Sequence, residues 1–120
     1  MGLATSNALV TTDVAEVRRG IAARLLVATH TACDGLGADA ATAVGQLPTP
    51  DQRLTDELNR AYLTLAQAAQ DCTEATGFAG AGFARFERAA TAGMGWLHRA
   101  EARYRELTAP ASRGRGSSTQ

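Results

Sequence analysis

Residues 49–76, TPDQRLTDELNRAYLTLAQAAQDCTEAT, contain the local pattern that decides the fold class. Thr49 offers an N-cap hydroxyl, Pro50 suits the first position of a helix, and Gln52 stands at the capping-box position. Apolar side chains then recur at alternating steps of four and three residues. Because that spacing places them on one helix face, the stretch predicts a helix over about 51–76.

The same heptad spacing continues to residue 107, which predicts coiled-coil-like packing. Its two sets are Leu58, Leu65, Cys72, Ala79, Phe86, Gly93, Ala100 and Leu107, and Tyr62, Ala69, Thr76, Phe83, Ala90, Leu97 and Tyr104. Three glycines between residues 77 and 82 each cost about 1 kcal/mol relative to Ala inside a helix. We therefore expect either a turn there, followed by a helix over about 83–108, or a bend in one long helix.

The first half of the chain repeats small and apolar residues at steps of three or four, from Val10 to Leu47. This periodicity predicts one helix over about 13–44, with residues 1–11 as a flexible N-terminus. Gly45 and Pro48 are typical helix-stop residues. Residues 109–120, rich in Ser, Gly and Arg, are predicted to form a disordered tail.

Composition favours an all-α protein. The chain has 26 Ala but only six Val plus Ile among its 120 residues, whereas strands prefer β-branched and aromatic residues. One helical domain over 12–108 is expected, as an antiparallel helical hairpin or a three-helix bundle.

The charges exclude one class of function. Twelve Arg balance twelve Asp plus Glu, and there is no Lys, so the chain lacks the basic excess of an electrostatic nucleic-acid binder. No apolar run approaches the ~18 to 20 residues that cross a bilayer, and the first dozen residues do not form an ordinary secretory signal. We expect a soluble protein, cytoplasmic unless it is exported without a cleaved signal peptide.

Groups suited to catalysis or metal binding are few. No nucleophile elbow, phosphate-binding loop or dinucleotide fingerprint is present, so we expect no enzyme activity and no cofactor. His30 and Cys33 share a helix face and, with Cys72 or His98, are the candidates for a metal site. A tight turn at 48–50 places Cys33 opposite about residue 65, which disfavours both that site and a disulfide with Cys72.

Five of the six aromatic residues follow residue 77. They form either a lopsided core within one chain or a hydrophobic seam for a helix of a protein partner or of a second copy in a homo-oligomer. The interface candidates are Phe83, Phe86, Trp96, Leu97 and Tyr104.

The Ala-rich, Lys-free helical pattern over residues 10–108 resembles the small WXG-type proteins of type VII secretion, and especially their relatives that lack the Trp-x-Gly turn. The family's export signature is Tyr-x-x-x-Asp/Glu; here Tyr104 is followed four residues later by Thr108. The resemblance implies a secreted substrate, or a cytosolic escort that pairs with a larger partner. The alternatives are an unrelated cytoplasmic helical adaptor or assembly subunit, and a small ligand- or metal-binding bundle.

Overall fold

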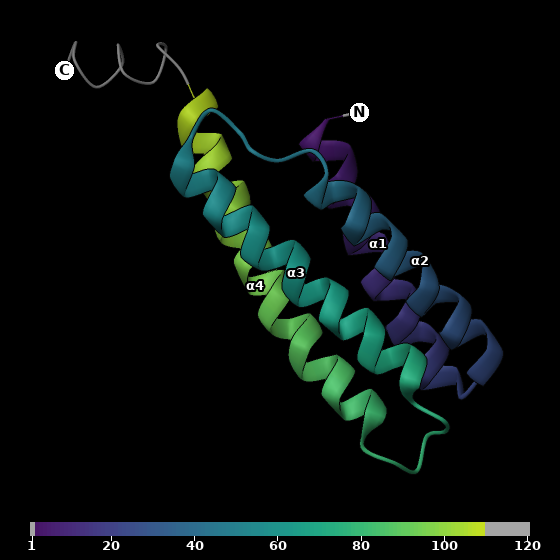
Figure 1. The fold of residues 1–120 in the computed structure, drawn as a ribbon. Helices are drawn as coiled ribbons and strands as arrows, with labels where there is room; N and C mark the ends of the chain where they lie inside the picture. Colours follow the sequence, from purple (N-terminus) through teal and green to yellow (C-terminus); the bar gives the residue numbers. More distant parts are fainter. Residues whose placement is uncertain (1, 110–120) are drawn as a thin grey trace, which may run out of the picture.

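The computed structural model describes residues 2–109, which form four helices and no strand (Figure 1). The helices are α1 (Leu3–Ala23), α2 (Leu26–Val44), α3 (Gln52–Glu74) and α4 (Gly82–Thr108). The predicted all-α class is confirmed, although the number of helices differs from the expected hairpin or three-helix bundle. The tail predicted over 109–120 lies outside the described residues except for Ala109.

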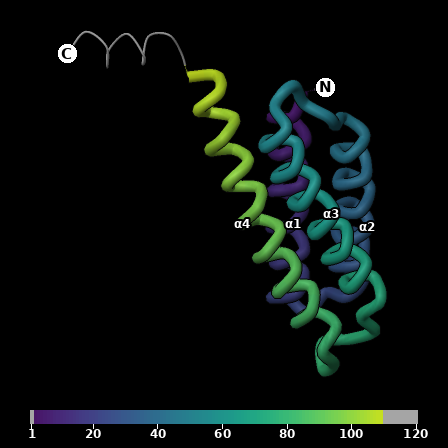
Figure 2. The backbone as a smooth tube through the Cα atoms, turned by 60° about the vertical axis from the view of Figure 1, so that its left-hand side comes forward, coloured from purple at the N-terminus to yellow at the C-terminus, as the bar shows by residue number. Residues whose placement is uncertain are grey.

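Consecutive helices run antiparallel, and each packs mainly against the next one in the chain (Figure 1). Thus α1 lies against α2, α2 against α3, and α3 against α4, whereas α1 and α4 touch little. Figure 2 shows that α4 leans away from α1 towards its C-terminal end. The four helices therefore form a bundle whose α1–α4 seam is only partly closed.

The heptad pattern describes the core of α3 and α4 well. Both sets are buried along these helices up to Ala100, with Tyr62, Leu65, Phe86 and Leu97 among the largest fully buried side chains. Between the two helices, residues 75–81 form the connection, so α3 and α4 are separate helices. Burial of this continuous stripe is the main force that pairs them.

The prediction of one helix over 13–44 is wrong, because the chain turns back at Arg24 and Leu25. Arg24 adopts the left-handed conformation (φ 55°, ψ 45°) that ends α1. The buried positions of α2 begin at Thr29 and Cys33, one residue out of step with the sequence stripe. The two stripe members that follow the turn, Ala28 and Ala32, are alanines, and alanine fits buried and exposed helix positions equally well.

The prediction of a flexible N-terminus over 1–11 is also wrong, since α1 begins at Leu3. No side chain caps this start. Tertiary contacts hold it instead: Ser6 donates to the Gln46 side chain at 2.9 Å, and the buried Asn7 accepts from the Tyr62 hydroxyl at 2.5 Å. A start that depends on partners 40 and 55 residues away has no local sequence signal.

The N-cap of α3 lies two residues later than the one predicted from the sequence. Asp51, not Thr49, is the N-cap, and its carboxylate accepts from the Leu54 amide at 2.8 Å. Thr49 bonds with the Thr55 hydroxyl at 2.8 Å and so shapes the approach to the helix. Aspartate is favoured here because its second role, described below, needs a charge.

Cys33 and Cys72 form a disulfide, which the sequence analysis disfavoured; their Cα atoms are 5.8 Å apart. The tight turn assumed there is absent, because residues 45–51 run on past the end of α2 before α3 begins. Cys33 lies 11 residues before the end of α2, and Cys72 lies 20 residues after the start of α3. Because the two cysteines are side by side, the start of α3 extends past the end of α2 by nine residues, or about 13 Å of helix. The α3–α4 hairpin therefore extends beyond α2 at this end of the bundle.

Candidate functional site

The inner stripe of α4 is uncovered over its last two turns. Ala100 is fully buried, but the next members of the heptad, Tyr104 and Leu107, are 48% and 46% exposed. They lie where α4 extends beyond α2 and leans away from α1 (Figure 2). An exposed apolar stripe that continues a buried one is a candidate contact surface.

A cleft of about 580 Å³ opens between α1 and α4 at this end, with α3 as its floor. We call it the α1–α4 cleft. It is lined by Leu3, Ala4, Asn7, Ala8, Thr11 and Thr12 of α1, Leu54 and Leu58 of α3, and His98, Ala100, Glu101, Tyr104 and Arg105 of α4. An adjoining hollow of about 420 Å³ shares Leu3, Leu54 and Tyr104 with it and extends to Leu107 and Thr108.

The α1 wall of the cleft carries no charge, because residues 3–12 contain neither acid nor base. The α4 wall carries Glu101 and Arg105, one helical turn apart. Deeper in, burial and, to a smaller extent, the charge of Glu101 together raise the pKa of the Tyr62 hydroxyl to about 12. The phenol therefore stays neutral and donates to Asn7, which closes the interior behind the cleft.

The far end of the same seam is held by an ion pair. Arg18 of α1 donates twice to the Glu87 carboxylate of α4, at 2.7 and 3.0 Å. This pairing lowers the pKa of Glu87 below its usual value. The seam is therefore bridged near the α3–α4 connection and open near the C-terminal end of α4.

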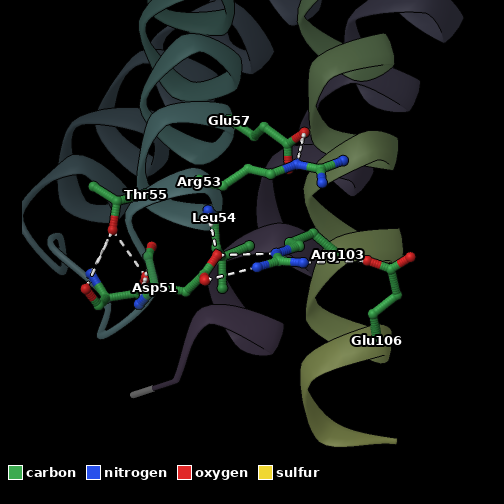
Figure 3. A network of polar contacts seen from close by, with 8 residues as sticks. Asp51, Arg53, Leu54, Thr55, Glu57, Arg103 and Glu106 are labelled. Carbon is green, nitrogen blue, oxygen red and sulfur yellow. Dashed lines mark hydrogen bonds and ion pairs between the residues drawn. The ribbon is translucent and has the colours of Figure 1, made fainter.

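A second ion pair fixes the position of the α4 wall on α3 (Figure 3). Arg103 donates to both oxygens of Asp51, at 2.8 and 3.0 Å, and also reaches Glu106. Its guanidinium, with help from the Leu54 amide, holds the pKa of Asp51 at about 2. Because Asp51 also caps α3, one carboxylate ties the start of α3 to the last turns of α4.

The structure does not place the five interface candidates on one surface. Phe83, Phe86 and Leu97 lie in the core at 7%, 0% and 0% exposure. Trp96 is half-buried and lines neither the cleft nor the adjoining hollow; the guanidinium groups of Arg60 and Arg99 lie within 5.0 Å of its ring centre. Tyr104 alone lines the cleft.

The metal candidates are separated or already bonded. The two cysteines share their disulfide, and His30 Nε2 donates to the Ala75 carbonyl at the end of α3 at 2.7 Å. His98 lies on the cleft wall of another helix. Within residues 2–109, no group of three or more His, Cys, Asp or Glu side chains is arranged to hold a metal ion.

Sequence reasoning missed most of the cleft. Tyr104, an interface candidate, and Leu107 were both in the heptad, and their place near the end of the pattern was the available signal for an uncovered turn. Leu3 and Ala4 carried no sequence signal for a binding site, because their role depends on where the first turn of α1 lies relative to the other helices. The comparisons give no further guide: no family model, curated protein or solved structure matched this chain. In the described part of the chain, no helix is long and apolar enough to cross a bilayer.

Proposed function

We propose that this protein is a non-enzymatic interaction module that binds an amphipathic helix in the α1–α4 cleft. The observation that carries the proposal is the exposure of Tyr104 and Leu107 beside an apolar cleft, in a stripe that is otherwise buried. A helix laid between α1 and α4 would continue the packing already present between α3 and α4. Binding would therefore use the same apolar burial that forms the fold.

The cleft suits a helix better than a small polar ligand. Six of its thirteen lining residues are Leu or Ala, with amide and hydroxyl groups on the α1 side and the side chains of His98, Glu101, Tyr104 and Arg105 on the α4 side. Apolar side chains at steps of three and four would enter it, and Tyr104 would act as an aromatic anchor.

The test uses the double variant Tyr104→Glu/Leu107→Glu and the wild type, each carrying an affinity tag and expressed in the native host. We expect this variant to keep its helicity and melting temperature, since both residues are exposed, and to lose whatever protein chain stays bound to the wild type. Leu63→Glu is the matched control, because Leu63 is 53% exposed on α3 but does not line the cleft. Equal binding by the cleft variant and the wild type would refute the cleft as the binding site.

Between the two roles implied by the type VII secretion resemblance, we propose the exported substrate rather than the cytosolic escort. The support is the fully buried Cys33–Cys72 disulfide, because stable disulfides are typical of oxidising compartments. Alkylation of free thiols at the moment of lysis would test this. Oxidised protein in the medium is the expected result, and fully reduced protein confined to the cytosol would contradict it.

A further inference from the structure

The α4 wall of the cleft carries charges that complement themselves. Glu101 and Arg105 both line the cleft, and neither takes part in an ion pair among residues 2–109. Other charges nearby are paired, as Arg103 is with Asp51. Two unpaired opposite charges one turn apart are the arrangement that an antiparallel copy of the same helix would satisfy.

The open part of this wall is centred on the same point as the two charges. Its residues in the cleft and the adjoining hollow run from His98 to Thr108, so position 103 is the midpoint. Position 103 is also midway between Glu101 and Arg105. A two-fold axis that crosses the cleft side of α4 at the level of position 103 places each open turn of one α4 against an open turn of the other. It also places each Glu101 against an Arg105 of the other copy.

We propose that a second copy of this chain occupies the cleft, with the C-terminal halves of the two α4 helices packed antiparallel. The inference rests on the proposed function and names its partner. In a two-fold interface each contact occurs twice, so a single Glu101–Arg105 match provides two ion pairs. The second copy's α4 lies between α1 and α4 of the first, and closes the seam that the monomer leaves open.

The apolar parts of the two copies also complement each other. Tyr104 and Leu107 of each copy would be covered at the interface, beside the Leu3 and Leu54 side chains that line the cleft and the hollow. The chain's own residues 110–120 are a poorer occupant, because Pro110 and Ala111 are their only apolar residues. They supply no large side chain to cover Tyr104 and Leu107.

The test measures the molar mass of the oxidised full-length chain by light scattering and sedimentation across a concentration series. We expect a dimer. Glu101→Arg and Arg105→Glu each put like charges together twice, and each should raise the dimer dissociation constant by about tenfold or more. The double variant Glu101→Arg/Arg105→Glu restores both pairs and should recover the wild-type constant.

The matched control is Arg88→Glu, which makes the same charge change at an exposed position of α4 outside the cleft and should leave dimerisation unchanged. Circular dichroism melts of every variant separate weakened association from lost folding. A double variant no better than the singles would overturn the antiparallel register.

Failure of the dimer and failure of the proposed function give different results. A wild type that stays monomeric at millimolar concentration overturns the second copy as occupant. If this wild type binds a different protein, and the Tyr104→Glu/Leu107→Glu variant does not bind it, the proposed function stands. A dimer that survives that cleft variant also overturns the second copy as occupant, and the proposed function falls with it only if the variant keeps every other bound protein as well.

Discussion

The two hairpins of this protein are built from different materials. In α3–α4 seven of the fifteen buried helix residues are Leu, Tyr or Phe, including Leu58, Tyr62, Leu65 and Phe86, and a side chain caps the start of α3. In α1–α2 they are mostly Val, Ala, Thr, Gly and Cys, and neither helix has a side-chain cap. The first hairpin therefore has little local reason to form, and its stability depends on its contacts with the second.

The disulfide is the strongest link between the two hairpins, so its loss should have the largest effect. Replacing Cys33 and Cys72 together with Ala opens a loop that spans 39 positions. Loop-closure entropy predicts a loss of about 4 kcal/mol in the free energy of unfolding. Urea denaturation measures the loss, and hydrogen exchange should show α1 and α2 losing protection before α3 and α4.

Reduction of the wild type provides a second measurement that leaves the sequence intact. The reduced protein should show the same order of protection between the two hairpins. If α3–α4 lost protection first, the dependence of the first hairpin on the second would be contradicted.

An added methyl group should be tolerated less at Gly20, where α1 meets α2, than at Gly93, where α4 meets α3. A Cβ at Gly20 would collide with Thr29 Oγ1 and lie 3.1 Å from the Thr29 Cα, so α1 and α2 would have to separate. We expect Gly20→Ala to cost about 2 kcal/mol, within the usual range for overpacking. A Cβ at Gly93 would lie 2.8 Å from the Leu65 Cγ and Cδ2 atoms, and a leucine side chain adjusts more easily than backbone.

Gly93→Ala should therefore cost less than Gly20→Ala in urea denaturation. Gly95→Ala is the control, because nothing lies within 4 Å of its Cβ position and the helix gains up to about 1 kcal/mol from alanine. Equal losses in the free energy of unfolding for Gly20→Ala and Gly93→Ala would contradict the expected difference between these two sites.

The Asp51–Arg103 pair should give the second hairpin a dependence on acid. Arg103 and the Leu54 amide hold the pKa of Asp51 at about 2, below its ordinary value of 3.8. The stabilisation is therefore present above the ordinary value and is lost as pH falls through about 2. Asp51→Ala, which removes both the cap and the ion pair, should lower the melting temperature at pH 6 more than Thr49→Ala does. The opposite ranking would show that Thr49 is the effective cap.

The first hairpin should show a pH dependence of opposite sign. Burial, a hydrogen bond with Asp39 and the charges of Asp39 and Glu16 together raise the pKa of Asp13 to about 7. Between the ordinary value of 3.8 and about 7 the folded state binds more protons than the unfolded state, so Asp13 makes stability fall as pH rises. In thermal melts, Asp13→Asn should raise the melting temperature relative to the wild type more at pH 8 than at pH 5. Asp34→Asn, which makes the same change at an exposed position of α2, is the matched control.

The sequence alone determined the helical class and the inner face of α3–α4. The heptad from Leu58 to Ala100 is local information, since each large apolar residue must be buried and its spacing states on which face. The break at Arg24 and the burial of Ser6 were hidden among alanines and small polar residues, which fit either side of a helix.

Only the tertiary structure decided the cystine and the cleft. Both depend on how far α3 extends beyond α2, a distance that the connection over 45–51 allows but does not encode. That register brings Cys33 to Cys72 and leaves Tyr104 and Leu107 without cover. Periodicity assigns each residue to a helix face, but the relative positions of the helices along their axes depend on packing between distant segments.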